Sequence, residues 1–130
     1  MDILQPPNWS QPKGYSNGIA AKGTMVFVAG MVGWNNKEEF ETENFAEQAR
    51  QALKNIVAVL GEADAKPEHI TRMIWYFIDI DEYKASLPDL GKVYQQEFGK
   101  IYPAMTGIQV AGLVESRARL EIEVTAVIPD

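Results

Sequence analysis

The segment 70–78, Ile-Thr-Arg-Met-Ile-Trp-Tyr-Phe-Ile, most constrains how this 130-residue chain can fold. A β-strand turns successive side chains to opposite faces of its sheet. In this segment both faces carry large apolar groups: Met73, Trp75 and Phe77 on one, Ile74, Tyr76 and Ile78 on the other. Such a strand is stable only if both faces are covered, so the fold needs a layer on each side of the sheet.

Two amphipathic helices are available to form one of these layers. Apolar residues recur at helical spacing over about 44–62, where Thr42 or Asn44 can cap the start, and Gly61 and then Pro67 end the helix. A second helical region follows the candidate caps Asp79 and Asp81 and reaches Phe98, with a fresh turn at Pro88. Its inner stripe is Leu87, Leu90, Tyr94 and Phe98.

The remaining strands complete a β-β-α-β-α-β-β order. Residues 19–21 and the apolar run 24–30, which we expect to be covered on both faces, suggest a hairpin; further strands are expected at about 105–112 and 118–127. The last strand alternates strictly, so Arg119, Glu121, Glu123 and Thr125 share its polar face. These patterns predict a single α+β domain over 1–130, a two-layer sandwich with a mostly antiparallel sheet, preceded by an extended arm over 1–14 with Trp9 as a candidate anchor.

Two helices can cover only one face of this sheet. The other face of strand 70–78 still requires an apolar partner, and a second copy of the same chain is the simplest one. The sequence therefore predicts a homo-oligomer.

Composition excludes several function classes. The chain has no cysteine, which rules out a disulfide scaffold, a thiolate nucleophile and a cysteine-ligated zinc. Its net charge is -6 and its 12 basic residues are dispersed, which argues against a nucleic-acid partner. We see no membrane span and no signal peptide, and expect a cytoplasmic protein with no membrane partner. Asp79, Asp81 and Glu82 form a weak carboxylate cluster that helix capping explains equally well, so no metal site is predicted.

A family resemblance enters in the last third of the chain. Its residues are Tyr102-Pro103-Ala104-Met105-Thr106, then Gln109-Val110-Ala111, Leu113, and Leu120-Glu121-Ile122-Glu123-Val124-Thr125-Ala126. This series resembles the RidA (YjgF/YER057c/UK114) signature, and residues 14–128 align with the family without large gaps. The resemblance implies a chorismate-mutase-like α+β fold, a homotrimer with ligand clefts between subunits, and hydrolysis of imines or enamines without metal or cofactor.

The resemblance also implies a site that has lost polar groups. Met105 stands where the family has an arginine that clamps the substrate carboxylate, and no nearby Arg or Lys visibly replaces it. Ala29 stands at the family's serine, beside the retained backbone amide of Gly30, and Gly107 stands where a cysteine is frequent. We therefore expect a roomier, more apolar pocket for an apolar or aromatic small molecule other than the usual 2-imino acids.

Two residues of this chain match site residues of the family. Tyr15 matches the family's cleft tyrosine, and Glu121 matches the glutamate that positions the hydrolytic water, since a partly buried carboxylate can shuttle a proton. The competing interpretation is that Tyr15 is an aromatic side chain in ordinary packing and that Glu121 has only a structural role in its strand. Glu123 is expected to have such a structural role, because Arg119 on the same face is available as an ion-pair partner. The expected substrate-binding residues are Tyr15, Ala29, Gly30, Trp34, Met105, Thr106 and Gly107, with Glu121 as the catalytic group; Trp34 is included only as a candidate aromatic wall.

Three functions follow as hypotheses. The first is a metal-free hydrolase or deaminase acting on an enamine or imine. The second is a non-catalytic trimer that binds a small molecule or protects client proteins. The third is an endoribonuclease, which the acidity of the chain and its single histidine disfavour, because His69 lies in a polar stretch typical of the surface.

Overall fold

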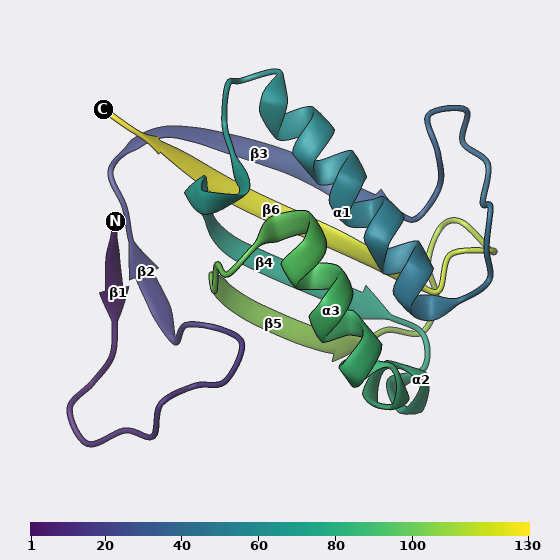
Figure 1. Ribbon diagram of the computed structural model, residues 1–130, viewed down its shortest axis with the longest axis horizontal. Coiled ribbons are helices and arrows are strands. Elements are labelled where there is room, and N and C mark those ends of the chain that lie inside the picture. Colours follow the sequence, from purple (N-terminus) through teal and green to yellow (C-terminus); the bar gives the residue numbers. More distant parts are fainter.

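The computed structural model describes residues 1–130 and forms two layers, a mixed β-sheet with helices packed on one face (Figure 1). The sheet contains β3 (Gly23–Val32), β4 (Ile70–Phe77), β5 (Ala104–Gln109) and β6 (Leu120–Pro129). The helices are α1 (Phe45–Gly61), α2 (Ile80–Ala85) and α3 (Leu87–Phe98), with a 3₁₀ turn η1 (Pro67–His69) before β4. The predicted α+β class and helical regions are confirmed.

The sheet has the order β3-β6-β4-β5. The β3/β6 and β6/β4 pairs are antiparallel, whereas β4 and β5 run parallel, with Met73 opposite Met105 and Trp75 opposite Gly107. A parallel pair needs a long crossover, and here α2 and α3 provide it. This register places alternate residues of β4 and β5 together under the helices.

The core lies between the sheet and the helices. Met73, Trp75 and Phe77 of β4 and the apolar face of β6 are buried there, as the alternation predicts. The fully buried Gln48 of α1 is satisfied by the backbone: its amide donates to the carbonyls of Thr42 and Arg117, and its carbonyl accepts from the Arg119 N–H. This side chain ties the loop before α1 to the segment before β6.

The second helical region is divided as the sequence predicts. Asp79 caps α2 by accepting hydrogen bonds from the backbone N–H groups of Asp81 and Glu82 at 2.9 and 3.3 Å. Pro88 lies in the first turn of α3, where its missing N–H costs nothing. The break between α2 and α3 allows Tyr83 to lie over the sheet beside Phe77.

The predicted hairpin between residues 19–21 and 24–30 is wrong. Strand β2 (Gly18–Ala20) instead pairs antiparallel with β1 (Asp2–Leu4), so the arm folds back on itself. Within that arm Trp9 is 62% exposed and anchors nothing in this chain. The arm is attached to the sheet further along, where Ser16 bridges Ala104 and donates its N–H to the Pro103 carbonyl at 3.1 Å.

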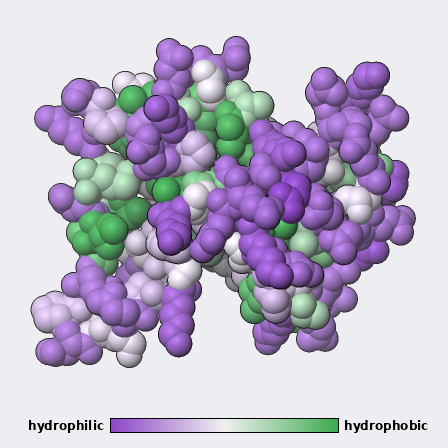
Figure 2. Space-filling view, viewed as in Figure 1, coloured by the Kyte–Doolittle hydropathy of each residue, from purple (hydrophilic) through white to green (hydrophobic).

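The face of the sheet that lies opposite the helices is open. Within a single chain strand β3 is covered on one face only, since Phe27 is 71% exposed and Met25 is 56% exposed, so coverage of its second face stays a prediction. Ile108 at the β5 edge is exposed as well. The helical side differs, because Figure 2 shows it covered mainly by hydrophilic residues. The open face thus exposes several large apolar side chains, as interaction surfaces often do.

The helices of this fold are all too short or too polar to cross a lipid bilayer.

Candidate functional site

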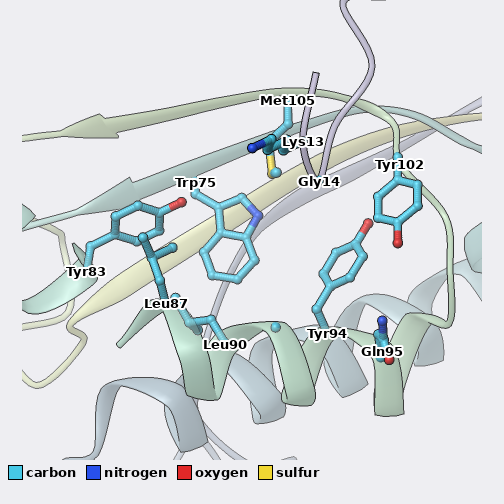
Figure 3. A pocket seen from close by; sticks show the side chains of 11 residues that line it. Lys13, Gly14, Trp75, Tyr83, Leu87, Leu90, Tyr94, Gln95, Tyr102 and Met105 are labelled. Atoms are coloured by element: carbon cyan, nitrogen blue, oxygen red, sulfur yellow. The ribbon is translucent and has the colours of Figure 1, made fainter. Parts of the chain in front are cut away.

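A cavity of about 330 Å³ lies between the edge of the sheet and the helices α2 and α3 (Figure 3). Its walls are mostly apolar and aromatic. The side chains that define it are Trp75, Tyr83, Leu87, Leu90, Tyr94, Tyr102 and Met105. A concave site with rings on several sides suits a small planar ligand.

The strand register explains why Met105 and Trp75 share this cavity. Both residues turn toward the helices, since Met73 lies opposite Met105 and Trp75 lies opposite Gly107 on the parallel pair. Gly107 has no side chain to occupy the space beside Phe77, and the Tyr83 ring stacks on Phe77 there at 4.3 Å between centroids. The apolar pocket expected around Met105 and Gly107 therefore has a defined wall of aromatic rings.

Trp75 brings an unpaired donor to the cavity. The residue is 5% exposed, and its indole Nε1 has no hydrogen-bond partner within the chain. In Figure 3 the edge of the indole that carries this nitrogen is turned toward Tyr94. A buried N–H without an acceptor is rare in folded proteins because it loses its bond to water and gains none.

Two phenols of the cavity, those of Tyr94 and Tyr83, have raised pKa values. Burial raises the pKa of Tyr94 well above its ordinary value, with a smaller contribution from Tyr102, and the Tyr94 hydroxyl donates to the Ile101 carbonyl at 2.8 Å. Burial also raises the pKa of Tyr83. These two hydroxyl groups therefore keep their protons further into the alkaline range than an ordinary tyrosine does.

One cation lies at this cavity. Lys13 and Gly14 of the arm line it together with Met105. The sequence showed no Arg or Lys near Met105. Lys13 is far from Met105 in sequence, but it lines the same cavity because the bridge from Ser16 to Ala104 brings the arm to the start of β5.

Glu121 and Gly30 form a separate hollow on the open face of the sheet. A β-bulge between Val28 and Met31 leaves Ala29 and Gly30 without partners on β6. A Cβ at Gly30 would lie 2.3 Å from the Glu121 carboxylate, so only glycine allows this approach. Bulges are frequent beside active sites because they redirect one side chain or expose one backbone segment. The hollow also contains Tyr76 and Glu123.

Glu123 has a different partner from the one expected. The Tyr76 hydroxyl donates to Glu123 at 2.8 Å, and this hydrogen bond raises the pKa of Tyr76. Arg119 precedes β6 and instead forms an ion pair with Glu82 at 2.8 Å. The two adjacent strand glutamates are therefore not equivalent, because the Glu121 side chain has no hydrogen-bond partner among the bonds of the chain.

The other predicted site residues lie apart from these two groups. Tyr15, 40% exposed, lines a different hollow with Ser16 and Tyr102, and Tyr102 also lines the ring-lined cavity. Thr106 is exposed on the open face, opposite to Met105 by strand alternation. Trp34 packs against Phe40 at 5.9 Å between centroids, outside both hollows. A single copy of the chain thus brings together Gly30 and Glu121, and separately Met105 and Gly107.

No three metal-ligating side chains gather anywhere in the fold. Asp79 is used as a helix cap and Glu82 in an ion pair, so the weak carboxylate cluster has structural roles. His69 is partly exposed and caps the turn η1, where its Nδ1 accepts from the Lys66 N–H at 3.0 Å.

Of the residues that line the cavity, sequence reasoning proposed only Met105 as a site residue. Trp75 was interpreted as part of an apolar strand face that needs a covering layer and Tyr94 as part of a helix stripe, and Lys13 was not considered. An unusually large aromatic content on β4 and α3 was the available signal, but periodicity cannot distinguish a ring in the core from a ring at a cavity wall.

Comparison with known proteins gives concordant matches. The family model described as Endoribonuclease L-PSP matches residues 9–128. A RutC family protein of Aquifex aeolicus is 32% identical over 130 residues, covering 98% of this chain and 99% of that protein. The human 2-iminobutanoate/2-iminopropanoate deaminase is 27% identical over 114 residues, 87% of this chain and 79% of that protein. The crystal structure of YyfB, a Rid-family protein of unknown function from Yersinia pestis, matches with a TM-score of 0.85 at 26% identity and 98% coverage of both chains.

Proposed function

The chain belongs to the RidA family, and on that basis we propose that it hydrolyses an imine or enamine, with release of ammonia, in a cleft between the subunits of a homotrimer. The observation that carries the proposal is the contact between Gly30 and Glu121. The bulge presents bare backbone beside a carboxylate that no other side chain engages. That pairing is what a hydrolytic water needs, since the carboxylate can take its proton while the backbone fixes the substrate.

The reaction follows from the carboxylate. Glu121 accepts a proton from water as the oxygen attacks the carbon of the C=N bond. This proton returns to the nitrogen to give a neutral carbinolamine. Glu121 then carries the hydroxyl proton of the carbinolamine to the same nitrogen as the C–N bond breaks, so ammonia leaves and the hydroxyl oxygen becomes that of a carbonyl product. An enamine enters this sequence after tautomerising to its imine. Water supplies every atom that is added, so the step requires no oxidant or reductant. The human relative is named as a deaminase of 2-iminobutanoate and 2-iminopropanoate.

We propose a different substrate from those two compounds. Met105 supplies no charge, and the cavity around it is formed by rings and aliphatic side chains. A small aliphatic imino acid would fill little of this cavity. A larger imine or enamine with an aromatic or apolar body fits it better, because buried apolar area contributes to binding.

The trimer is part of the proposal. Met105 lies on the helical side of the sheet and Glu121 on the open side, so the cavity and the carboxylate form one site only if they come from neighbouring copies. The exposed Met25 and Phe27 supply an apolar surface for such contact.

The test is ammonia release from imines generated in situ by an amine oxidase or an amino-acid oxidase. We expect Glu121→Gln to lower the rate by about 10²- to 10⁴-fold, the usual contribution of a general base. Glu123→Gln is the matched control, because it changes a carboxylate two residues away that is held by Tyr76. Equal rates for the wild type and Glu121→Gln would exclude the mechanism.

Non-catalytic binding is the second candidate, favoured by the existence of the ring-lined cavity itself. It would be supported by a ligand that raises the melting temperature without any turnover. The family description mentions an endoribonuclease, but a net charge of -6 and a single histidine that caps a turn do not favour that activity.

A further inference from the structure

The buried N–H of Trp75 has no role in the fold or in the proposed reaction. Its Nε1 lacks an acceptor although the residue is 5% exposed and lies in the wall of a cavity. Glu82 Oε1 is the other buried polar side-chain atom without a partner, but its carboxylate is already engaged through Oε2 with Arg119. An unsatisfied donor costs free energy unless a bound group supplies the acceptor.

The surroundings of Trp75 define what kind of acceptor can reach it. Tyr83, Tyr94 and Tyr102 place rings around the cavity, so the body of a ligand there is planar and apolar. The Tyr94 hydroxyl donates its proton to the Ile101 carbonyl, and its oxygen forms no hydrogen bond with Trp75 Nε1. The one positive charge at the cavity is Lys13, on the arm.

The volume of the cavity limits the size of the ligand. About 330 Å³ lies at the lower end of the range for small-molecule sites, which suits a compound with a single ring.

We propose that this cavity binds an aromatic compound carrying a carbonyl or carboxylate oxygen, and that this oxygen accepts a hydrogen bond from Trp75 Nε1–H. A carboxylate would also meet Lys13, which then takes the place of the absent arginine as a point charge. The inference rests on the proposed function in that the cavity is the substrate-binding part of the same cleft. Trp75 is a binding residue in this scheme and takes no part in proton transfer.

Proton NMR of the ¹⁵N-labelled full-length protein tests the hydrogen bond directly. The chain has three tryptophans, so three indole N–H signals are expected, and Trp9→Phe and Trp34→Phe assign the third to Trp75. The probes are acetophenone, phenylacetate and ethylbenzene, which share a ring but differ in the acceptor. We expect the Trp75 proton to move downfield with at least one of the two oxygen-bearing probes and not with ethylbenzene.

Two variants measure how much the hydrogen bond contributes to affinity and identify whether its acceptor is a carboxylate or a carbonyl oxygen. Trp75→Phe keeps a ring but removes the donor, so affinity for the oxygen-bearing probe should fall about tenfold or more while that for ethylbenzene changes little. If the acceptor is a carboxylate, Lys13→Gln should lower the affinity for phenylacetate alone. If the acceptor is a carbonyl oxygen, Lys13→Gln should lower the affinity for none of the probes. The wild-type NMR titration decides the question even if Trp75→Phe does not fold.

The inference is overturned if neither oxygen-bearing probe moves the Trp75 signal, or if ethylbenzene moves it equally. It is also overturned if a folded Trp75→Phe protein keeps full affinity for acetophenone and phenylacetate. These readouts involve no turnover. If the protein releases ammonia through Glu121 but the Trp75 signal does not shift, the proposed function stands and this inference fails. If the Trp75 signal shifts but Glu121→Gln does not lower the rate of ammonia release, this inference stands and the proposed function fails.

Discussion

Replacing Gly30 by alanine separates the geometry of the site from the stability of the fold. The added Cβ would lie 2.3 Å from Glu121 Oε2 and 2.7 Å from its Cδ. Both atoms belong to the end of a flexible side chain, so the carboxylate can move away while the backbone stays in place. Gly33→Ala is the matched comparison, because its Cβ would lie 2.4 Å from the backbone oxygen of Gln48, which α1 holds fixed.

The magnitudes follow from the size of the displacement. Ordinary contact with Glu121 requires the carboxylate to retreat by roughly 1 Å, and a misplacement of this size can cost about 10²-fold in rate. The rotamer change itself costs about 1 kcal/mol. Gly33→Ala has no side chain to move, so overpacking should destabilise the protein by about 1–3 kcal/mol, with a fall in Tm of roughly 4 °C for each kcal/mol.

Ammonia release and thermal unfolding, measured on the same preparations, test this pair. Gly30→Ala should lose activity and keep its Tm within about 4 °C of the wild type. Gly33→Ala should have a lower Tm than the wild type and retain its activity at low temperature. A Gly30→Ala enzyme with wild-type rates would refute the argument that the Glu121 carboxylate must remain against bare backbone, and a Gly30→Ala protein that unfolds would show that the bulge is needed for the fold.

Three further substitutions address the assembly, the cavity and the missing charge. Phe27→Asp puts a charge on the open face and should convert the proposed trimer to a monomer in sedimentation analysis, whereas Val59→Asp on α1 should leave the mass unchanged. A wild-type protein that is already monomeric would contradict the proposed assembly. Because burial raises the pKa of Tyr94 above its ordinary 10.0, the unfolded chain ionises first, and stability should decline from about pH 10 upward. Tyr94→Phe should lessen this decline of stability at alkaline pH, measured by denaturation at several pH values. At neutral pH the substitution should cost about 1 kcal/mol of stability, because the hydrogen bond to the Ile101 carbonyl is lost. An unaltered decline at alkaline pH would contradict the raised pKa of Tyr94. Met105→Arg should create ammonia release from 2-iminopropanoate if the remaining site is competent, and no gain would mean that more than the charge is missing.

The fold was predictable because its strands and helices have strong periodic patterns. Alternation identified the buried faces of β4 and β6, and the cap at Asp79 and the break at Pro88 marked the division of the second helical region. The pairing of β1 with β2 could not be predicted, because strands of three residues contain too little pattern to specify a partner.

The candidate site was only partly predictable. Motif matching identified Gly30, Glu121 and Met105, but it could not show that Glu121 and Met105 lie on opposite faces within one chain. The partner of Arg119 was missed because Glu82 is 37 residues away and reaches it only through the position of α2. Lys13 was missed for the same reason, since its position depends on the bridge from Ser16 to Ala104.

The parallel pairing of β4 with β5 has a consequence for how relatives can diverge. Met105 faces the cavity and Thr106 faces the opposite surface, and their roles depend only on the count of residues from Pro103. One inserted or deleted residue before Ala104 would exchange the two, turning the cavity-facing side chain outward and the side chain of the open face inward. In evolution the length of the segment that enters β5 should therefore vary far less than its composition, and new ligand preferences should arise by substitution at positions 105 and 107 while that length stays constant.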